Sequence, residues 1–190
     1  MARWEPNTRE RLVLAALDLF IENGYDNTTV AQIAERTGLT KTTFFRHFPD
    51  KREVLFAGQE SQGRLLADGI AAAPAHATPL EAVAAGLDAV TGSFTPEQRG
   101  FAPRIQAVIA GHPELRERSA FKHTGLGEAM AEALRARGVP EPAATLAADL
   151  GVRAFHRSFD RWIDPPNSTP LPDLAREELR LLHTTATTLA

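Results

Sequence analysis

Apolar residues in the first part of the chain recur at the spacing of short amphipathic helices. Five of them fall on one helical face, because they recur at i, i+3, i+4, i+7 and i+8: Leu12, Ala15, Ala16, Leu19 and Phe20. Glu10 lies three residues after Asn7, which is the spacing of a capping box. Gly24 fits the end of this helix, because glycine adopts the left-handed C-terminal conformation without steric cost. We therefore predict a first helix between Asn7 and Gly24.

Two shorter helices are predicted immediately afterwards. Thr29 and Gln32 form a second capping box, which opens a helix that ends at Gly38. Thr40 is the expected N-cap of the next helix, Lys41–Phe48, and the proline that follows stops it. Two short helices joined by a three- or four-residue turn containing glycine are typical of a helix-turn-helix motif.

The apolar residues of this motif are predicted to form its core. Leu39 fills the gap between the two helices, and Phe44 and Phe48, four residues apart, pack against the first helix. These two rings are expected in the core rather than stacked on bases. Any helical hairpin can pack in this way, so the pattern favours DNA binding without requiring it.

The rest of the chain is also predicted to be helical. Asp50 with Glu53 caps a fourth helix that runs to about Ala73, and Gly125-Leu126-Gly127 is a candidate interruption of a later one. Further capping boxes or prolines open helices at Thr78, Thr95, Pro113, Pro142 and Pro172. No alternating strand pattern is present. We predict an all-α chain of nine or ten helices, with an N-terminal three-helix helix-turn-helix domain and a second helical domain after it.

Composition and charge narrow the function classes. The 190 residues are 43% hydrophobic and contain no cysteine, which excludes disulfides, thiolate metal sites and cysteine nucleophiles. No apolar run reaches the roughly 18 residues of a membrane span, and no secretion signal is evident, so we expect a cytoplasmic protein without a membrane partner. The net charge of −3 arises after residue 56, whereas Lys41, Arg46, Lys51 and Arg52 oppose only Asp50 within residues 41–52. This patch suits phosphate binding, although a solvated charged face gives the same pattern.

The segment from Gly24 to Leu55, GYDNTTVAQIAERTGLTKTTFFRHFPDKREVL, resembles the signature of the tetracycline-repressor (TetR) family. The resemblance implies a DNA-binding domain over residues 1–49 and an effector-binding and dimerisation domain over residues 50–190. It also implies a homodimeric repressor that binds a palindromic operator and is released by a small apolar or amphipathic molecule. Two positions depart from the family pattern: Thr42 stands where glycine is frequent, and Phe45 where tyrosine usually contacts a phosphate.

The predicted DNA contacts lie in and around the third helix, whose N-terminal end enters the major groove in such motifs. Lys41 and Thr42 are the candidates to read bases, and Phe45 to pack against sugar or a thymine methyl group. Arg46 is a candidate for a phosphate contact or for an ion pair with Asp50. The complete set is Thr29, Thr40, Lys41, Thr42, Thr43, Phe45, Arg46, His47 and Lys51, of which Thr29 and Thr40 have helix capping as an alternative role.

The last two predicted helices are the expected dimer interface. Two-fold symmetry is needed because one recognition helix contacts few bases. The apolar stripes of these helices are equally compatible with a monomer core. They contain Leu146, Leu150, Phe155, Phe159, Trp162, Leu174, Leu179, Leu182 and Leu189.

An effector of unknown identity is expected among the middle helices. The candidate ligand-binding residues are Phe94, Phe101, Arg104, Ile105, Phe121 and Phe155, with His123 and His156 as further polar anchors. The same residues fit a regulator without an effector, in which they are only scaffold.

An enzyme is the alternative class. His112, Glu114, Glu117 and His123 resemble a loose metal-ligand set, and His156 with Asp160 has the spacing of a base and its orienting acid. Neither has a specific motif around it. Gly125-Leu126-Gly127 follows no strand and has no third glycine, so a nucleotide loop is rejected. We predict no catalysis, no metal and no cofactor.

Overall fold

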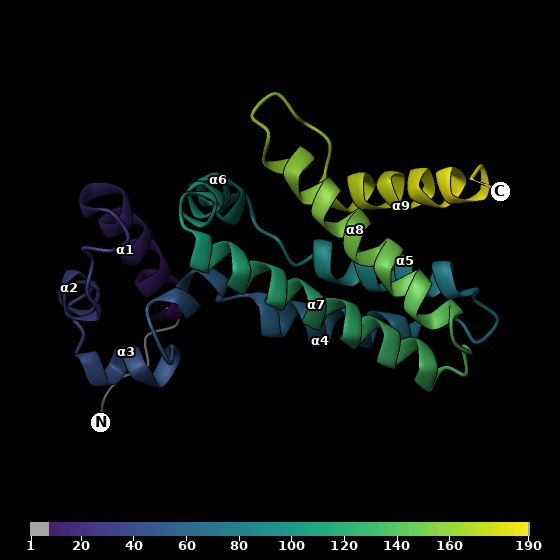
Figure 1. Ribbon diagram of the computed structural model, residues 1–190, viewed down its shortest axis with the longest axis horizontal. Coiled ribbons are helices and arrows are strands. Elements are labelled where there is room, and N and C mark those ends of the chain that lie inside the picture. Colours follow the sequence, from purple (N-terminus) through teal and green to yellow (C-terminus); the bar gives the residue numbers. More distant parts are fainter. Residues whose placement is uncertain (1–7, 190) are drawn as a thin grey trace. The chain divides into compact units, whose positions relative to one another are not determined.

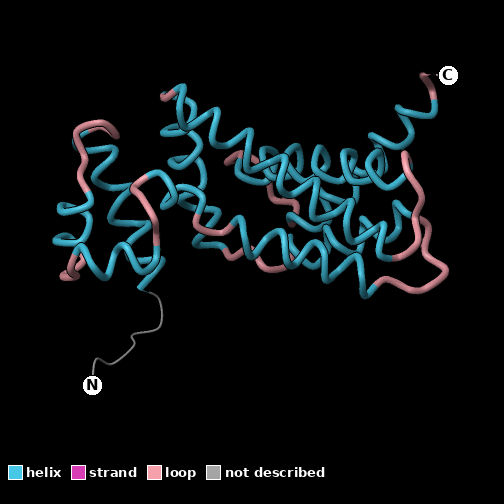
Figure 2. The backbone as a smooth tube through the Cα atoms, turned by 60° about the horizontal axis from the view of Figure 1, so that its bottom comes forward, coloured by secondary structure: helices cyan, strands magenta, loops and turns pink. Residues whose placement is uncertain are grey.

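The computed structural model describes residues 8–189, and all regular structure in that range is helical (Figure 1, Figure 2). The predicted all-α fold is confirmed for this range, whereas Asn7, the expected N-cap of the first helix, lies outside it. The elements are α1 (Thr8–Asn23), α2 (Val30–Arg36), α3 (Lys41–His47), the 3-10 helix η1 (Arg52–Phe56), α4 (Gln59–Ala72), α5 (Pro79–Thr91), α6 (Pro96–Gly111), α7 (Pro113–Ala136), α8 (Ala143–Ile163) and α9 (Leu171–Thr187).

The chain folds into two compact units that are interleaved along the sequence. The first unit ends at Gly58 and also includes Phe101–Ser119, and the second consists of Gln59–Gly100 and the residues from Ala120 onward. Helices α6 and α7 therefore each contribute residues to both units. The functional division into residues 1–49 and 50–190 stays a prediction.

The first unit has a core made by the apolar faces of α1, α2 and α3. Phe44 and Phe48 are buried in this core and Leu39 packs against it, which confirms their predicted packing. Leu115, near the start of α7, is fully buried in the same cluster. Gly24 and Gly38 have φ angles of 81° and 71°, the left-handed conformation expected after α1 and α2.

The predicted fourth helix, from Asp50 to about Ala73, is wrong as a single element. The chain forms η1 first, and α4 begins only at Gln59. Val54, Leu55 and Phe56 are all buried, although three successive residues point in different directions around an α-helix. A tight 3-10 turn followed by a break allows all three side chains to reach the core of the first unit.

The second unit depends on a close approach of α4 and α5. A Cβ atom added at Gly86 would lie 2.7 Å from the carbonyl oxygen of Leu66 and 2.9 Å from the side chain of Ile70. A Cβ atom added at Gly69 of α4 would lie 2.7 Å from the Cα atom of Gly86. The two glycines therefore let the helix backbones pack directly against each other.

Helix α7 is continuous from Pro113 to Ala136, so the candidate interruption at Gly125-Leu126-Gly127 does not form. Leu126 is buried, and glycine lowers helix propensity by only about 1 kcal/mol. Packing of Leu126 therefore outweighs the low helix propensity of the two glycines.

Helices α8 and α9 complete the second unit and are joined by a buried carboxylate. Glu178 is 2% exposed, and it accepts hydrogen bonds from Arg157 at 2.6 Å and from Arg161 at 2.7 Å. Burial alone would raise the pKa of Glu178, but the two guanidinium groups lower it overall. Within residues 8–189, no helix combines the length and apolar character that crossing a membrane requires.

We expect Gly86→Ala to lower the free energy of unfolding by about 1–3 kcal/mol, because the new methyl group forces α4 and α5 apart. Gly125→Ala is the matched control, since it lies in a helix of the same unit and a Cβ there meets nothing within 4 Å. The free energy of unfolding of the control is expected to rise by up to about 1 kcal/mol, because alanine favours a helix more than glycine does. Urea unfolding measures both, and equal effects of the two substitutions would contradict the close helix crossing.

Candidate nucleic-acid interface

The turn between α2 and α3 is closed by backbone hydrogen bonds. The N–H of Gly38 donates to the carbonyl of Glu35 at 2.9 Å, and that of Leu39 donates to Ala34 at 2.8 Å. The hydroxyl of Thr37 also donates to the Ala34 carbonyl at 2.9 Å. These bonds fix the angle between the two helices, as a helix-turn-helix requires.

Threonine caps define the first turn of both helices. Thr29 and Gln32 form the predicted capping box, in which the Gln32 side chain accepts from the Thr29 N–H at 2.8 Å. The Thr40 hydroxyl accepts from the N–H of Thr43 at 3.1 Å, and the two threonine hydroxyls are 3.0 Å apart. The capping roles are confirmed, and the DNA contacts of these threonines stay a prediction.

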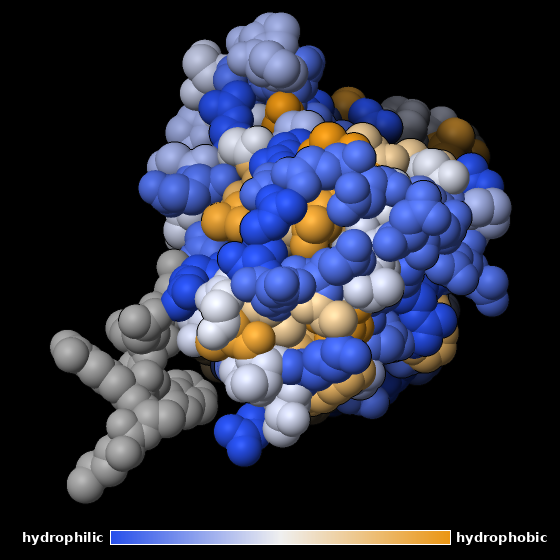
Figure 3. All heavy atoms as spheres, turned by 90° about the vertical axis from the view of Figure 1, so that its left-hand side faces the viewer, coloured by the Kyte–Doolittle hydropathy of each residue, from blue (hydrophilic) through white to orange (hydrophobic). Residues whose placement is uncertain are grey.

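The outward face of α3 consists of Lys41, Thr42, Phe45 and Arg46, which are all exposed. At about 100° per residue, these positions span roughly 140° of the helix surface. Thr43 and His47 are half-buried beside them. Figure 3 faces the side of the structure that carries α1, α2 and α3, and it shows mainly hydrophilic side chains with small hydrophobic patches between them.

Arg46 forms no ion pair or hydrogen bond with another described residue, so its predicted alternative pairing with Asp50 is wrong. Asp50 instead pairs with Arg52, with 2.6 Å between Oδ2 and Nη2. Burial alone would raise the pKa of Asp50, but the hydrogen bonds from Arg52 and from the Glu53 backbone lower it. Arg46 therefore remains available on the outward face of α3.

Lys51 is held inside the first unit. Its ammonium donates to the carbonyls of Tyr25 at 2.8 Å and Thr28 at 3.2 Å, and it lies 4.2 Å from the centre of the Tyr25 ring. These contacts fasten the turn between α1 and α2 just before Thr29. The predicted phosphate contact of Lys51 is not tested by this geometry.

The six predicted effector-binding residues are divided equally between the two units. Phe101 and Ile105 pack against the core of the first unit, and Arg104 forms an ion pair with Asp18 of α1. In the second unit, the rings of Phe94 and Phe155 have centroids 6.1 Å apart, and Phe121 is 68% exposed. A pocket formed by these residues stays a prediction.

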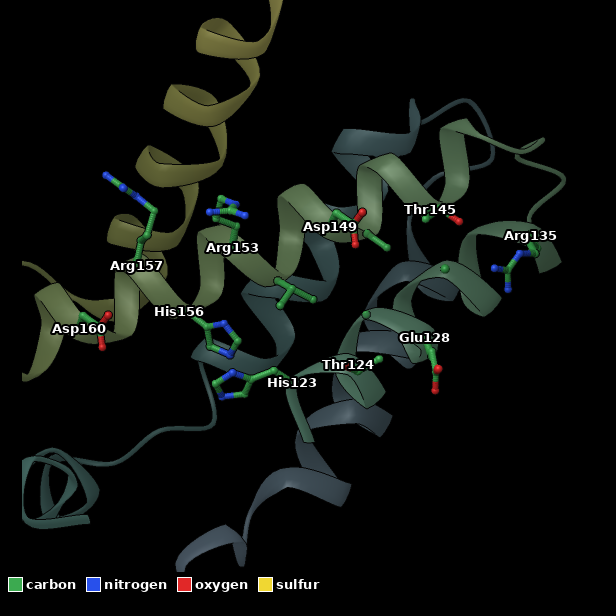
Figure 4. Close-up of a pocket in the computed structure, with 14 residues that line it drawn as sticks. His123, Thr124, Glu128, Arg135, Thr145, Asp149, Arg153, His156, Arg157 and Asp160 are labelled. Carbon is green, nitrogen blue, oxygen red and sulfur yellow. The ribbon is translucent and has the colours of Figure 1, made fainter. Parts of the chain in front are cut away.

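The second unit contains a hollow of about 760 Å³ between α7 and α8, and none of those six residues lines it. Figure 4 shows His123 of α7 and His156 of α8 pointing toward each other in this hollow, with ring centroids 3.7 Å apart. Burial lowers the pKa of both imidazoles, that of His156 to about 4 with a further contribution from His123. Both rings are therefore neutral near pH 7.

The residues considered for an enzyme belong to both units. His112, Glu114 and Glu117 belong to the first unit and His123 to the second. Within the described range, no three His, Cys, Asp or Glu side chains are placed to hold a metal ion. The ring of His156 contacts the ring of His123 at an interplanar angle of 39°, and Asp160, four residues after His156, lines the same hollow.

Comparison with known proteins identifies the helix-turn-helix region. The family model described as bacterial regulatory proteins, tetR family, matches residues 12–57, which cover α1, α2, α3 and η1. Residues 12–57 therefore form a DNA-binding domain of the TetR-family type.

Two relatives illustrate how far the likeness extends along the TetR-family sequences. The transcriptional regulator TcmR of Streptomyces glaucescens is 39% identical over 85 residues, which cover 45% of this chain and 38% of TcmR. BetI of Rhizobium meliloti is 36% identical over 105 residues, covering 55% of this chain and 49% of BetI. The matches thus span less than half the length of these relatives.

Solved structures share the fold over nearly the whole chain. A TetR-family regulator from Syntrophomonas wolfei has a TM-score of 0.60 at 17% identity, covering 94% of both chains. FadR from Bacillus subtilis, crystallised with stearoyl-CoA, has a TM-score of 0.56 at 19% identity, covering 91% of this chain and 96% of FadR. At these identities the likeness establishes the fold alone.

The two departures from the TetR-family pattern both lie on the outward face of α3. Phe45 is 53% exposed and presents an apolar ring where the family usually has a tyrosine hydroxyl. Thr42 adds an exposed methyl and hydroxyl where glycine is frequent. Both positions belong to the set predicted to contact DNA, and their effect on base preference stays a prediction.

Several hydrogen bonds and ion pairs within the first unit were not predicted from sequence. Arg11 donates to the Thr37 carbonyl at 2.9 Å, and Arg118 pairs with Glu53 at 2.7 Å. Lys51 holds the turn after α1 from 26 residues away. No local pattern indicates these contacts, because each joins residues that are distant in the sequence.

We expect Lys51→Ala to destabilise the first unit by about 1–3 kcal/mol, because it leaves the Tyr25 and Thr28 carbonyls without their cationic partner. Thermal unfolding and DNA affinity, measured on the same variant, separate the two roles of Lys51. Unchanged unfolding with weaker binding to all DNA sequences would instead support a phosphate contact. Arg116→Ala, an exposed change in the same unit, is the control.

Proposed function

We propose that this chain is a transcriptional repressor that binds a palindromic operator as a homodimer in the cytoplasm and is released by a small apolar or amphipathic molecule. The observation that supports the proposal most directly is the outward face of α3, where Lys41, Thr42, Phe45 and Arg46 are exposed on a helix whose other side is fixed in the core.

In the proposed complex, α3 enters the major groove from its N-terminal end. Lys41 and Thr42 contact base edges, and Phe45 packs against sugar or a thymine methyl group. Arg46, His47 and Lys51 contact phosphates. Thr29, Thr40 and Thr43 lie at the N-terminal turns of α2 and α3, where backbone N–H groups also favour phosphate.

The proposed dimer forms through α8 and α9. Phe155, Trp162, Leu174 and Leu179 are buried within one chain, so they are core residues of the monomer. Leu146 and Leu181 are 60% and 50% exposed, and they offer apolar surface to a second copy. Exposed leucines on both helices support an interface there, because large apolar side chains favour burial.

Effector release is proposed as a population shift between dimers that fit and do not fit the operator. Coupling of about 1–3 kcal/mol between the two sites changes operator affinity roughly 5- to 150-fold. The complex of FadR with stearoyl-CoA shows that a protein of this fold can hold a small molecule.

The test is a footprint of the full chain on the DNA upstream of its own gene, followed by affinity measurements at several salt concentrations. We expect protection of two half-sites about one helical turn, or a small multiple of it, apart. Affinity should fall linearly with salt on a double-logarithmic plot. A single asymmetric site, or an affinity independent of salt, would contradict the proposal.

A further inference from the structure

The hollow between α7 and α8 exists because the side chains that face each other across its floor are small. Gly127 and Ala131 come from α7, and Ala148 and Val152 from α8. A Cβ atom added at Gly127 would lie 3.5 Å from the Val152 side chain, in ordinary contact. The floor is therefore an apolar surface without long side chains, and it suits the flat face of a ligand.

The walls of this hollow, which we call the groove, carry both positively and negatively charged side chains. Arg153, Glu128 and Asp149 line it, and none of these three forms an ion pair with another described residue. Arg135 and Arg157 also line it but pair with Glu141 and Glu178. A ligand with a full charge of either sign would meet a like charge on a wall. Groups that both donate and accept hydrogen bonds match the lining better.

One end of the groove is formed by the two imidazoles, whose ring planes are tilted by 39° relative to each other. His123 and His156 are half-buried and face each other from different helices (Figure 4). A neutral imidazole has one donor and one acceptor nitrogen on a planar ring. Planar rings prefer offset or edge contacts with other aromatic rings, so this end favours an aromatic ligand over an acyl chain.

We propose that the groove between α7 and α8 binds a flat, hydroxylated aromatic molecule of two or three rings. The ring system lies on the Gly127–Ala131 and Ala148–Val152 floor, beside the histidine pair. Its hydroxyl groups donate to Asp149 or Glu128 and accept from Arg153 or Thr124. A volume of about 760 Å³ lies within the range of small-molecule sites, roughly 300–1,000 Å³.

As an effector site this inference rests on the proposed function, but binding itself does not. All of the lining residues belong to the second unit, separate from the DNA-facing surface of α3. Ligand binding is therefore measurable without DNA, and operator binding without ligand. Failure of one leaves the other measurable.

The probe is quercetin, a planar polyhydroxylated flavonoid, compared with flavone, which has the same ring skeleton without hydroxyl groups. Isothermal calorimetry on the full chain, with detergent present to suppress ligand aggregates, is expected to show quercetin binding at least about 10-fold more tightly than flavone. Absence of quercetin binding, or equal binding of the two, would overturn the hydroxylated class.

Variants locate the site. Gly127→Leu fills the floor and is expected to weaken quercetin binding at least about 10-fold. Gly125→Leu is the matched control on the same helix, because its Cβ faces open space. Should Gly127→Leu fail to fold, Asp149→Asn with Arg153→Gln alters only exposed wall groups and is expected to give a similar loss. Unchanged binding in folded variants of the floor or the walls would overturn the assignment.

Discussion

Lys41→Ala combined with Arg46→Ala is expected to reduce operator affinity at least about 100-fold at moderate salt, without loss of the fold. Both side chains are exposed on α3, and neither forms an ion pair with another described residue. Loss of a base contact costs about 1–3 kcal/mol of binding free energy. Loss of a phosphate contact weakens binding further, because fewer counterions are released from the DNA. Fluorescence anisotropy on the footprinted operator, with circular dichroism of the variant, measures both quantities.

The single variants separate base reading from phosphate binding. Lys41→Ala and Thr42→Ala should change which bases are preferred, whereas Arg46→Ala should weaken all sequences alike and lower the salt slope by about 1. Arg64→Ala is the control, because Arg64 is exposed on α4 and pairs with Glu60. A change of base preference in Arg46→Ala but not in Lys41→Ala would contradict the proposed docking of α3.

Leu146→Asp combined with Leu181→Asp is expected to convert the protein to a monomer and to reduce operator affinity at least about 100-fold. A carboxylate placed in an apolar interface must be desolvated, and a monomer engages only one half-site. Because both leucines are exposed in a single chain, the substitutions should leave the monomer fold intact. Sedimentation velocity gives the oligomeric state, and anisotropy gives the affinity.

Ile21→Asp provides the control for oligomeric state, since Ile21 is 57% exposed but lies on α1. The control is expected to sediment like the parent protein. A Leu146→Asp, Leu181→Asp variant that stays dimeric would place the interface on another surface. One that becomes monomeric yet retains full affinity would contradict the need for two half-sites.

The sequence by itself determined the elements whose signals are local. Capping boxes at Thr29 and Thr78, the N-cap at Thr40 and the left-handed glycines Gly24 and Gly38 depend on residues only a few positions apart. The apolar spacing that placed Phe44 and Phe48 in the core is equally local. These signals were sufficient for the all-α fold and for the helix-turn-helix.

Tertiary structure decided the features that join distant segments. Burial of Val54, Leu55 and Phe56 outweighed the helical pattern of residues 50–73, and packing of Leu126 kept α7 continuous through two glycines. Lys51 turned inward to carbonyls about 25 residues away, which no spacing rule describes.

The candidate effector site was the least predictable part. Phe94, Phe101 and Phe155 pack in or against the cores, because aromatic side chains have a large apolar area to bury, whereas Phe121 is exposed. The hollow described above forms where Gly127, Ala131 and Ala148 leave space between α7 and α8. A cavity forms where small residues of two helices lie opposite each other. Which residues lie opposite each other is decided only when the helices pack.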